Sequence, residues 1–245
     1  MSNRKRDGGR MRREWDAMAR DDAMRYITDG TVADEEAFFR SGEALVAGVL
    51  ARVGYEPEPG EAALEIGCGL GRTVRALAAR FARVVGVDVS EEMIRQARDL
   101  LADCPNVELV VGNGTDLGFA EDGAFAFCFS YIAFQHIPDR RIVAAYLREI
   151  ARVLGPGGVA CIQLHTQPPG PWAWLRDRLR RLVGAATEAT GLRRLYRGEP
   201  RYPCRFVYPI PLADVERMVR DAGLAIDSVE APHTPETWVA CRKPS

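Results

Sequence analysis

The most constraining feature of the sequence is a short apolar run that leads into three closely spaced glycines. The run from Ala62 to Ile66 has the length of a buried parallel strand, and Gly67, Gly69 and Gly71 follow it directly. Residues Thr73 to Phe81 are rich in alanine and leucine, and their spacing predicts a helix. Glycines at such a turn let a ligand approach the backbone, whose free N–H groups at the helix start attract polar or negative groups. The stretch therefore predicts a site for a nucleotide-like cofactor.

The spacing of the glycines separates two kinds of nucleotide ligand. The dinucleotide fingerprint is G-x-G-x-x-G, but here Gly71 comes one position early and Arg72 occupies the place of the third glycine. Glu65 would end a buried strand with a carboxylate, which is costly unless a donor satisfies it. That carboxylate would repel a pyrophosphate and attract the ammonium group of an amino acid. We therefore expect a ligand that carries such a group.

The segment Glu65 to Gly71, E-I-G-C-G-L-G, resembles the first motif of the class I S-adenosylmethionine (SAM) dependent methyltransferases. The resemblance implies an α/β, Rossmann-like fold with a seven-stranded, mostly parallel sheet, a C-terminal antiparallel hairpin and helices on both faces. It implies SAM as the cofactor and a small-molecule acceptor, methylated on oxygen or nitrogen. The cofactor-binding residues that it implies are Glu65, Gly67, Cys68, Gly69, Asp88, Val89, Met93, Asn113, Gly114 and Ser130.

A second apolar run, Val84 to Val87, ends in Asp88. This carboxylate comes about twenty residues after the glycines, where a doubly wound sheet returns its second strand beside the first. It could then accept hydrogen bonds from both ribose hydroxyls. Ser90 reads as a helix N-cap, and Met93 would lie against the adenine. The alternatives are that Asp88 is only a turn residue and that Met93 belongs only to the core.

A third predicted strand, Val107 to Val111, is followed by Gly112, Asn113 and Gly114. In the resembled family an aspartate usually stands here and accepts a hydrogen bond from the adenine amino group. The amide oxygen of Asn113 could take its place, and Asp116 is the rival acceptor.

The segment after the fourth predicted strand, Ala124 to Ser130, indicates the class of acceptor. Residues Ser130 to Asp139 lack the Asn or Asp followed by two prolines that grips a flipped base in nucleic-acid methyltransferases. They resemble the corresponding segment of small-molecule enzymes. The candidates for a general base are Tyr131, His136 and His165. His136 has a structural alternative, in which it bonds a backbone group and fixes the loop.

The remaining elements of the predicted fold alternate in the order that the family implies. We expect a helix at Arg140 to Leu154, a glycine turn at Gly155 to Gly158 and a fifth strand at Val159 to His165. A final helix, Leu212 to Gly223, should precede a hairpin formed by Ala225 to Glu230 and Glu236 to Arg242. The resemblance covers residues 62–164 and 212–242.

Two regions lie outside that resemblance. Residues 1–60 are expected to form a frayed basic tail and a helical cover, with helices at Glu14 to Ile27 and Asp34 to Val53. Trp15, Tyr26 and Arg40 are candidate lid or pocket residues, and the alternative for the two aromatics is simple packing against the sheet.

The second region is a lid-like insertion at residues 166–211 within the methyltransferase domain, 61–245. It contains a basic amphipathic stretch, Pro171 to Val183, and eight arginines against three acids between Pro171 and Arg201. Such a helix could lie on a membrane, close over the pocket or present a solvated charged face. The excess charge favours an anionic or lipid-like acceptor.

Composition limits the other possibilities. A net charge of −1 argues against a general nucleic-acid binder, and the absence of a long apolar stretch predicts a cytoplasmic protein without a membrane span. The six cysteines are scattered and no pair has zinc or redox spacing, so we expect no metal site. Two other classes stay open: a nicotinamide-dependent oxidoreductase and a non-catalytic SAM-binding protein. The sequence leaves the oligomeric state open.

Overall fold

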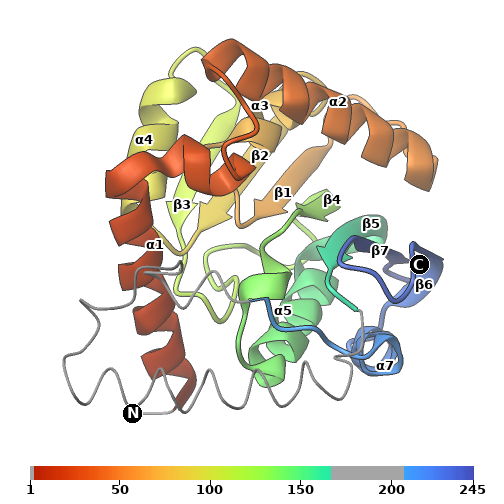
Figure 1. The fold of residues 1–245 in the computed structure, drawn as a ribbon. Coiled ribbons are helices and arrows are strands. Elements are labelled where there is room, and N and C mark those ends of the chain that lie inside the picture. The colour runs from red at the N-terminus through yellow and green to blue at the C-terminus, as the bar shows by residue number, and fades with distance from the viewer. Residues whose placement is uncertain (1–2, 167–206) are drawn as a thin grey trace, which may run out of the picture.

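A computed structural model describes residues 3–166 and 207–245, and their side chains from residue 8 onward. Seven strands form one sheet in the order β3-β2-β1-β4-β5-β7-β6 (Figure 1). The strands are β1 (Ala62–Ile66), β2 (Arg83–Asp88), β3 (Val107–Val111), β4 (Phe125–Ser130), β5 (Leu154–Leu164), β6 (Ala225–Glu230) and β7 (Thr237–Arg242). The first five are parallel, and β7 runs antiparallel to both β5 and β6. The predicted fold class is confirmed.

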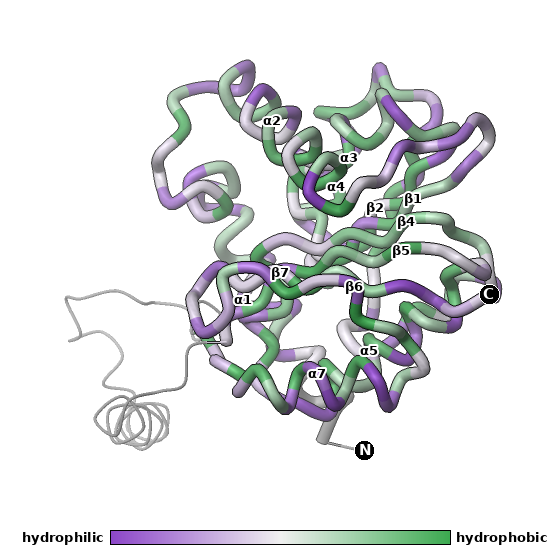
Figure 2. The backbone as a smooth tube through the Cα atoms, turned by 90° about the vertical axis from the view of Figure 1, so that its right-hand side faces the viewer, coloured by the Kyte–Doolittle hydropathy of each residue, from purple (hydrophilic) through white to green (hydrophobic). Residues whose placement is uncertain are grey.

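Helices cover both faces of the sheet (Figure 2). One face carries α2 (Glu35–Val53), α3 (Arg72–Ala78) and α4 (Glu91–Leu100), and the opposite face carries α5 (Arg140–Val153) and α7 (Leu212–Asp221). Each face buries its own apolar cluster against the sheet. Strand β1 lies between these layers and is buried from Ala63 to Ile66, as expected for a central parallel strand.

The strand order places the candidate residues together. The order reverses between β1 and β4, because β2 and β3 lie on one side of β1 and β4 and β5 on the other. Glu65 pairs with Gly86 of β2 and Phe129 of β4, so the carboxyl ends of all three strands meet at one edge. Ligands of open α/β sheets bind at such a reversal point.

Helix α1 (Asn3–Thr28) differs from the sequence-based expectation. The basic segment near the N-terminus is helical from Asn3, and the prediction of a frayed tail is wrong. A kink at Asp22, where φ is −164° and ψ is 87°, divides the helix. The first part packs beside α4, and the part after the kink turns toward the carboxyl ends of β1 and β2 (Figure 1). Within the basic segment, Arg12 donates to the backbone oxygen of Gly112 over 2.8 Å, and Asp16 and Ala19, further along the helix, bond residues of α4.

The other differences are local. Strand β5 begins at Leu154 rather than Val159, because Leu154 pairs with Phe125 ahead of a register shift, and Gly157 and Gly158 bond the backbone of Lys243. Helix α3 ends at Ala78, three residues before Phe81. Most of the predicted insertion, including Pro171 to Val183, lies outside the described residues.

Two absences concern the described residues alone. Within 3–166 and 207–245, no helix has the length and apolar character needed to cross a membrane. In the same part of the chain, no three histidine, cysteine, aspartate or glutamate side chains gather as a metal site would require. The five described cysteines are free thiols.

Candidate functional site

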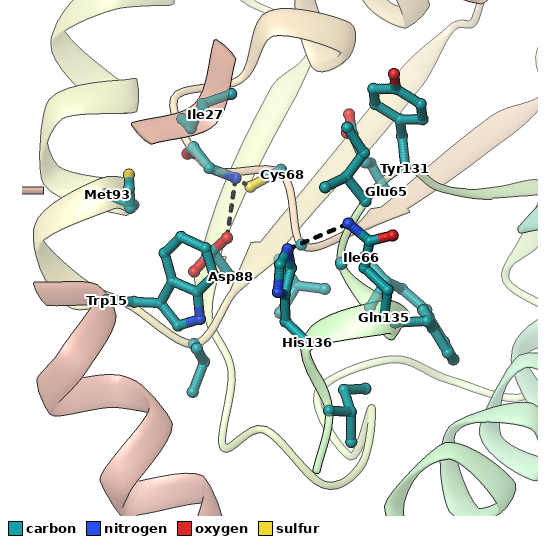
Figure 3. A pocket seen from close by; sticks show the side chains of 18 of the residues that line it. Trp15, Ile27, Glu65, Ile66, Cys68, Asp88, Met93, Tyr131, Gln135 and His136 are labelled. Carbon is teal, nitrogen blue, oxygen red and sulfur yellow. Dashed lines mark hydrogen bonds between the residues drawn. The ribbon is translucent and has the colours of Figure 1, made fainter. Parts of the chain in front are cut away.

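A cavity of about 300 Å³ lies at the carboxyl ends of β1, β2 and β4 (Figure 3). The glycine turn after β1 forms one wall, and the segment after β4 forms a second. Helix α1 closes the cavity with Met11, Trp15, Tyr26 and Ile27. Gly112 and Gly114, after β3, complete the lining. The cavity therefore joins segments from the first, second, third and fourth strands with the N-terminal helix.

The glycine turn requires its glycines for both conformation and space. Gly67 and Gly69 have φ values of 79° and 53°, in the left-handed region that side chains disfavour. A Cβ on Gly69 would lie 2.9 Å from the Cδ1 atom of Ile27 in α1. The Gly69 N–H donates to Asp88 Oδ2 over 2.9 Å, which fastens the turn to the end of β2. Cys68, also in the wall, is held as a neutral thiol because burial raises its pKa.

Glu65 contributes a buried carboxyl group to the wall of the cavity. Its side chain is only 2% exposed, and one carboxylate oxygen accepts a hydrogen bond from the Thr73 hydroxyl. The other oxygen, Oε2, has no hydrogen-bond partner among the described residues. Burial raises the pKa of Glu65 to about 8, although the Thr73 hydroxyl and the charge of Arg72 oppose the rise. An unsatisfied buried carboxylate in a cavity wall fits a cationic ligand group that carries N–H donors.

Asp88 lies at the end of β2 and faces the same cavity. Its carboxylate accepts from the backbone N–H groups of Gly69 and Ser90, at 2.9 and 2.8 Å. Burial raises the pKa of Asp88, and these N–H donors oppose that rise. Val89 and Met93 also line the cavity, and Met93 is 1% exposed, so it is both a core residue and part of the wall.

The structure places Asn113 differently from its neighbours. Gly112 and Gly114 line the cavity, whereas Asn113 is exposed and outside the wall. Its Oδ1 accepts from the backbone N–H groups of Thr115 and Asp116, and its Nδ2 donates to Asp116 Oδ1 over 2.7 Å. Both candidate side chains are therefore engaged in an Asx-type turn, and the backbone is what this loop presents to the cavity.

Ser130 and His165 also lie outside the wall of the cavity. The Ser130 hydroxyl is fully buried and donates to the backbone oxygen of Ile66 over 2.8 Å, which ties β4 to β1. His165 follows β5, and its backbone oxygen accepts from the Ile210 N–H over 3.0 Å. Burial lowers the pKa of His165. These two residues support neighbouring backbone rather than face the cavity.

Tyr131 and His136 are the candidate bases that do line the cavity. His136, in the short helix η1 (Phe134–His136), meets the ring of Trp15 edge-on, with 5.6 Å between centroids and 73° between planes (Figure 3). The Tyr131 ring stacks on Trp238 at 5.6 Å and lies 5.4 Å from the Arg72 guanidinium. Both side chains are held by aromatic contacts.

The N-terminal candidates divide in the same way. Trp15 and Tyr26 line the cavity, while Arg40 is exposed and pairs with Glu36 on α2. Sequence reasoning missed Asp16 and Gln163, which hold the walls in place. Asp16 lies among other charged residues, so only its tertiary partners distinguish it. A polar residue in an otherwise apolar fifth strand was the available signal for Gln163.

Comparison with known proteins gives one family. Residues 63–158 match the family model of a methyltransferase domain. Trans-aconitate 2-methyltransferase of Azoarcus sp. (strain BH72) is 38% identical over 136 residues, covering 50% of this chain and 48% of that protein. Demethylmenaquinone methyltransferase of Clavibacter sepedonicus is 37% identical over 115 residues, covering 47% and 45%. The chain thus spans about half the length of these relatives.

One solved structure matches more of the chain than these two relatives do. Magnesium protoporphyrin IX methyltransferase from Synechocystis PCC 6803, solved with bound S-adenosylhomocysteine (SAH), superposes with a TM-score of 0.63 and 17% identity. The match covers 97% of this chain and 99% of that one, and it shows a shared fold. The family match contains the glycine turn, Asp88 and the segment after β4. Residues 63–158 are thus similar to a methyltransferase domain, and the chain shares its fold with a solved methyltransferase.

Proposed function

We propose that the protein binds SAM in the cavity and transfers its methyl group to a small-molecule acceptor. The observation that carries the proposal is the free Oε2 atom of Glu65, a buried carboxylate oxygen beside a glycine turn. SAM offers an ammonium group that would satisfy this atom, and a nicotinamide dinucleotide offers a pyrophosphate that the carboxylate would repel. When bound, SAM supplies an activated methyl group.

The residues of the chain would then hold the cofactor from several sides. Glu65 would accept from the ammonium group, and Asp88 from the ribose hydroxyls. The backbone of Gly67, Cys68 and Gly69 leaves room for the ligand. The remaining contacts would come from Val89, Met93 and Gly114. Ser130 would act indirectly, by holding the backbone of Ile66, and Asn113 by fixing the shape of its loop.

On the acceptor side, the protein's task is to hold the reacting atom in line with the methyl group. Such positioning lowers a reaction barrier by roughly 7–11 kcal/mol. For an acceptor that carries a proton, the imidazole of His136 is the base that we favour, since it lines the cavity and its ring is oriented by Trp15. Tyr131 would shape the wall, and His165 lies outside the lining.

The acceptor class is a second part of the proposal. Two of the relatives are named as methyltransferases of trans-aconitate and of demethylmenaquinone. Arg72 lines the cavity and offers positive charge, and the insertion is rich in arginine. We therefore propose an anionic or lipid-like acceptor. The free cysteines support a reducing, cytoplasmic location.

The test is transfer of a labelled methyl group. The protein is incubated with methyl-labelled SAM and a panel of small carboxylic acids, phenols and quinols, and products are separated by mass. Transfer to one panel member, absent with Gly69→Val, would support the proposal. Binding of SAM without transfer to any tested class would favour the non-catalytic alternative. Binding of NAD in place of SAM would favour the oxidoreductase.

A further inference from the structure

The segment after β4 contains a backbone conformation that its residue disfavours. Ile132 has a φ of 59°, in the left-handed region, where a β-branched side chain crowds its own backbone. Ile132 is also part of the cavity wall, between Tyr131 and Ala133. A strained conformation persists only where the surrounding structure holds it. Some neighbouring group must therefore stabilise Ile132 in this state.

That neighbour is Gln163 of β5. Its side chain is 2% exposed, and its Oε1 accepts a hydrogen bond from the Ile132 backbone N–H over 3.0 Å. Its Nε2 donates to the backbone oxygen of Pro235 over 2.6 Å. The amide is thus bonded at both ends, once to the cavity wall and once to the loop between β6 and β7.

The loop between β6 and β7 is itself held firmly. Ala231 and His233 have φ values of 45° and 64°, and fully buried Thr166 and Thr237 bond one another through their hydroxyls. The His233 N–H donates to the Thr166 hydroxyl over 3.0 Å, and Thr237 Oγ1 donates to the backbone oxygen of Ala231 over 2.8 Å. Pro235 therefore offers Gln163 a fixed acceptor.

The conformation of Ile132 decides where its neighbours stand. Ala133 is packed so closely against the glycine turn that a Cβ on Gly67 would overlap its methyl group. Tyr131 is held with its ring on Trp238 of β7. A relaxed Ile132 would rotate the chain between these two contacts. The wall and the glycine turn would then lose their fit.

We propose that Gln163 is a positioning residue, which holds the Tyr131–Ala133 wall against the glycine turn by fixing Ile132 in its left-handed conformation. Because Gln163 lies behind the wall, it acts through Ile132 and touches no ligand. The binding test rests on the proposed function, since it uses a cofactor-like ligand.

The experiment measures SAH affinity by calorimetry, with thermal unfolding of each variant. Gln163→Met keeps the length of the side chain and removes both hydrogen bonds, and we expect about tenfold weaker SAH binding. Ile132→Gly removes the strain, so adding Gln163→Met to it should weaken binding by less than about threefold. Gln163→Glu, whose carbonyl still accepts from Ile132, should bind within about threefold of the wild type.

Asn106→Leu is the matched control. The Asn106 side chain also donates to two backbone oxygens, those of Ala78 and Phe81, but it lies outside the cavity wall. This variant should lose stability and keep its SAH affinity. Wild-type SAH affinity in folded Gln163→Met would overturn the positioning role. The role would also be overturned if Gln163→Met weakened SAH binding equally in the wild-type and Ile132→Gly backgrounds.

A second readout does not depend on ligand binding. Hydrogen exchange at the Ile132 amide should be slow in the wild type, also slow in Gln163→Glu, and at least about tenfold faster in Gln163→Met. If Gln163→Met does not fold, the wild-type rate decides: the proposal requires slow exchange at the Ile132 amide, and fast exchange there would overturn it. Failure of the wild type to bind SAH contradicts the proposed function alone, because the exchange result still tests Gln163.

Discussion

Asp16 of α1 caps helix α4 from outside that helix. Its Oδ1 accepts from the Ser90 hydroxyl over 2.7 Å and from the Glu92 backbone N–H over 3.1 Å, at the positively polarised end of α4. Ser90 in turn accepts from the Met93 N–H, so the two side chains share the capping of one helix. Helix α1, which closes the cavity, is thereby fastened to the start of α4.

This relationship predicts that Asp16→Ala lowers the free energy of unfolding by about 1–2 kcal/mol, because a buried hydroxyl and a helix N–H lose their acceptor. Denaturant unfolding measures the change. Asp99→Ala, which removes an exposed acid from α4, is the control and should change stability by less than about 0.5 kcal/mol. Equal effects of the two substitutions would show that the cap contributes nothing specific.

Asp88→Ala should weaken SAM binding by roughly 1.5–3 kcal/mol, since charge-assisted hydrogen bonds to the ribose would be lost. The same change frees the Gly69 N–H, so part of the loss would come from a looser turn. Calorimetry on folded variants measures the affinity, and Asp227→Ala on β6 serves as the control. Unchanged SAM affinity in Asp88→Ala would remove this residue from the site.

Gly69→Val should abolish cofactor binding while the sheet remains folded. The new side chain would require a disfavoured φ and would meet Ile27, which closes the turn. Gly48→Val is the matched control, because a Cβ at that position meets nothing within 4 Å. Circular dichroism checks the fold and calorimetry the binding. Normal SAM binding by Gly69→Val would mean that the ligand does not approach this turn.

Glu65 should couple SAM binding to proton release. Its folded pKa of about 8 exceeds the ordinary 4.5, so its contribution to stability is complete below 4.5 and is lost as the pH rises through 8. At pH 7 the ligand-free carboxyl is therefore mostly protonated. A cationic ligand group favours the ionised form, as Arg72 and the Thr73 hydroxyl already do, while Asp88 opposes it.

Calorimetry in two buffers with different ionisation enthalpies measures this proton. At pH 7, wild type should release about one proton more than Glu65→Gln when SAH binds. The glutamine keeps the size of the side chain and cannot titrate. Proton release by Glu65→Gln therefore measures the protons that come from the ligand and from other groups. Identical proton release by the two proteins would mean that no cation reaches Glu65.

The arginine-rich insertion carries a prediction from sequence alone, since its residues lie outside those that the structure describes. Replacing Arg176, Arg180 and Arg181 by glutamine should raise KM for an anionic acceptor and flatten its salt dependence, with SAM affinity unchanged. The reason is that a cleft of one sign concentrates opposite charge, screened beyond about 8 Å at physiological ionic strength. An unchanged KM and salt response would assign these arginines to a solvated helix face.

The sequence was sufficient for the sheet and the glycine turn. Strands such as Ala62–Ile66 are short apolar runs bounded by turns. Asp34 and Ser90 are residue types that favour the N-cap position, and they precede α2 and α4. The carboxyl ends of β1 and β2 meet at one edge because of the topology, which is why the sequence alone predicts Glu65 and Asp88 at one site.

The supporting residues could not be predicted, because their roles depend on contacts between distant segments. Gln163 reaches Ile132 across 31 positions and Asp16 reaches Ser90 across 74. Asn113 does not line the cavity for a local reason, because its side chain accepts hydrogen bonds from the N–H groups of Thr115 and Asp116 in a turn. Ser130 and His165 are polar residues at strand ends, but Ser130 bonds the backbone of Ile66 and neither residue lines the cavity.

The assignment of the cavity to SAM is tested most directly by titration of the purified protein with SAH and, separately, with NAD. We expect saturable, one-to-one binding of SAH that is weakened by Asp88→Ala and lost in Gly69→Val, with no binding of NAD. Binding of NAD with no binding of SAH would contradict the assignment of this cavity to SAM.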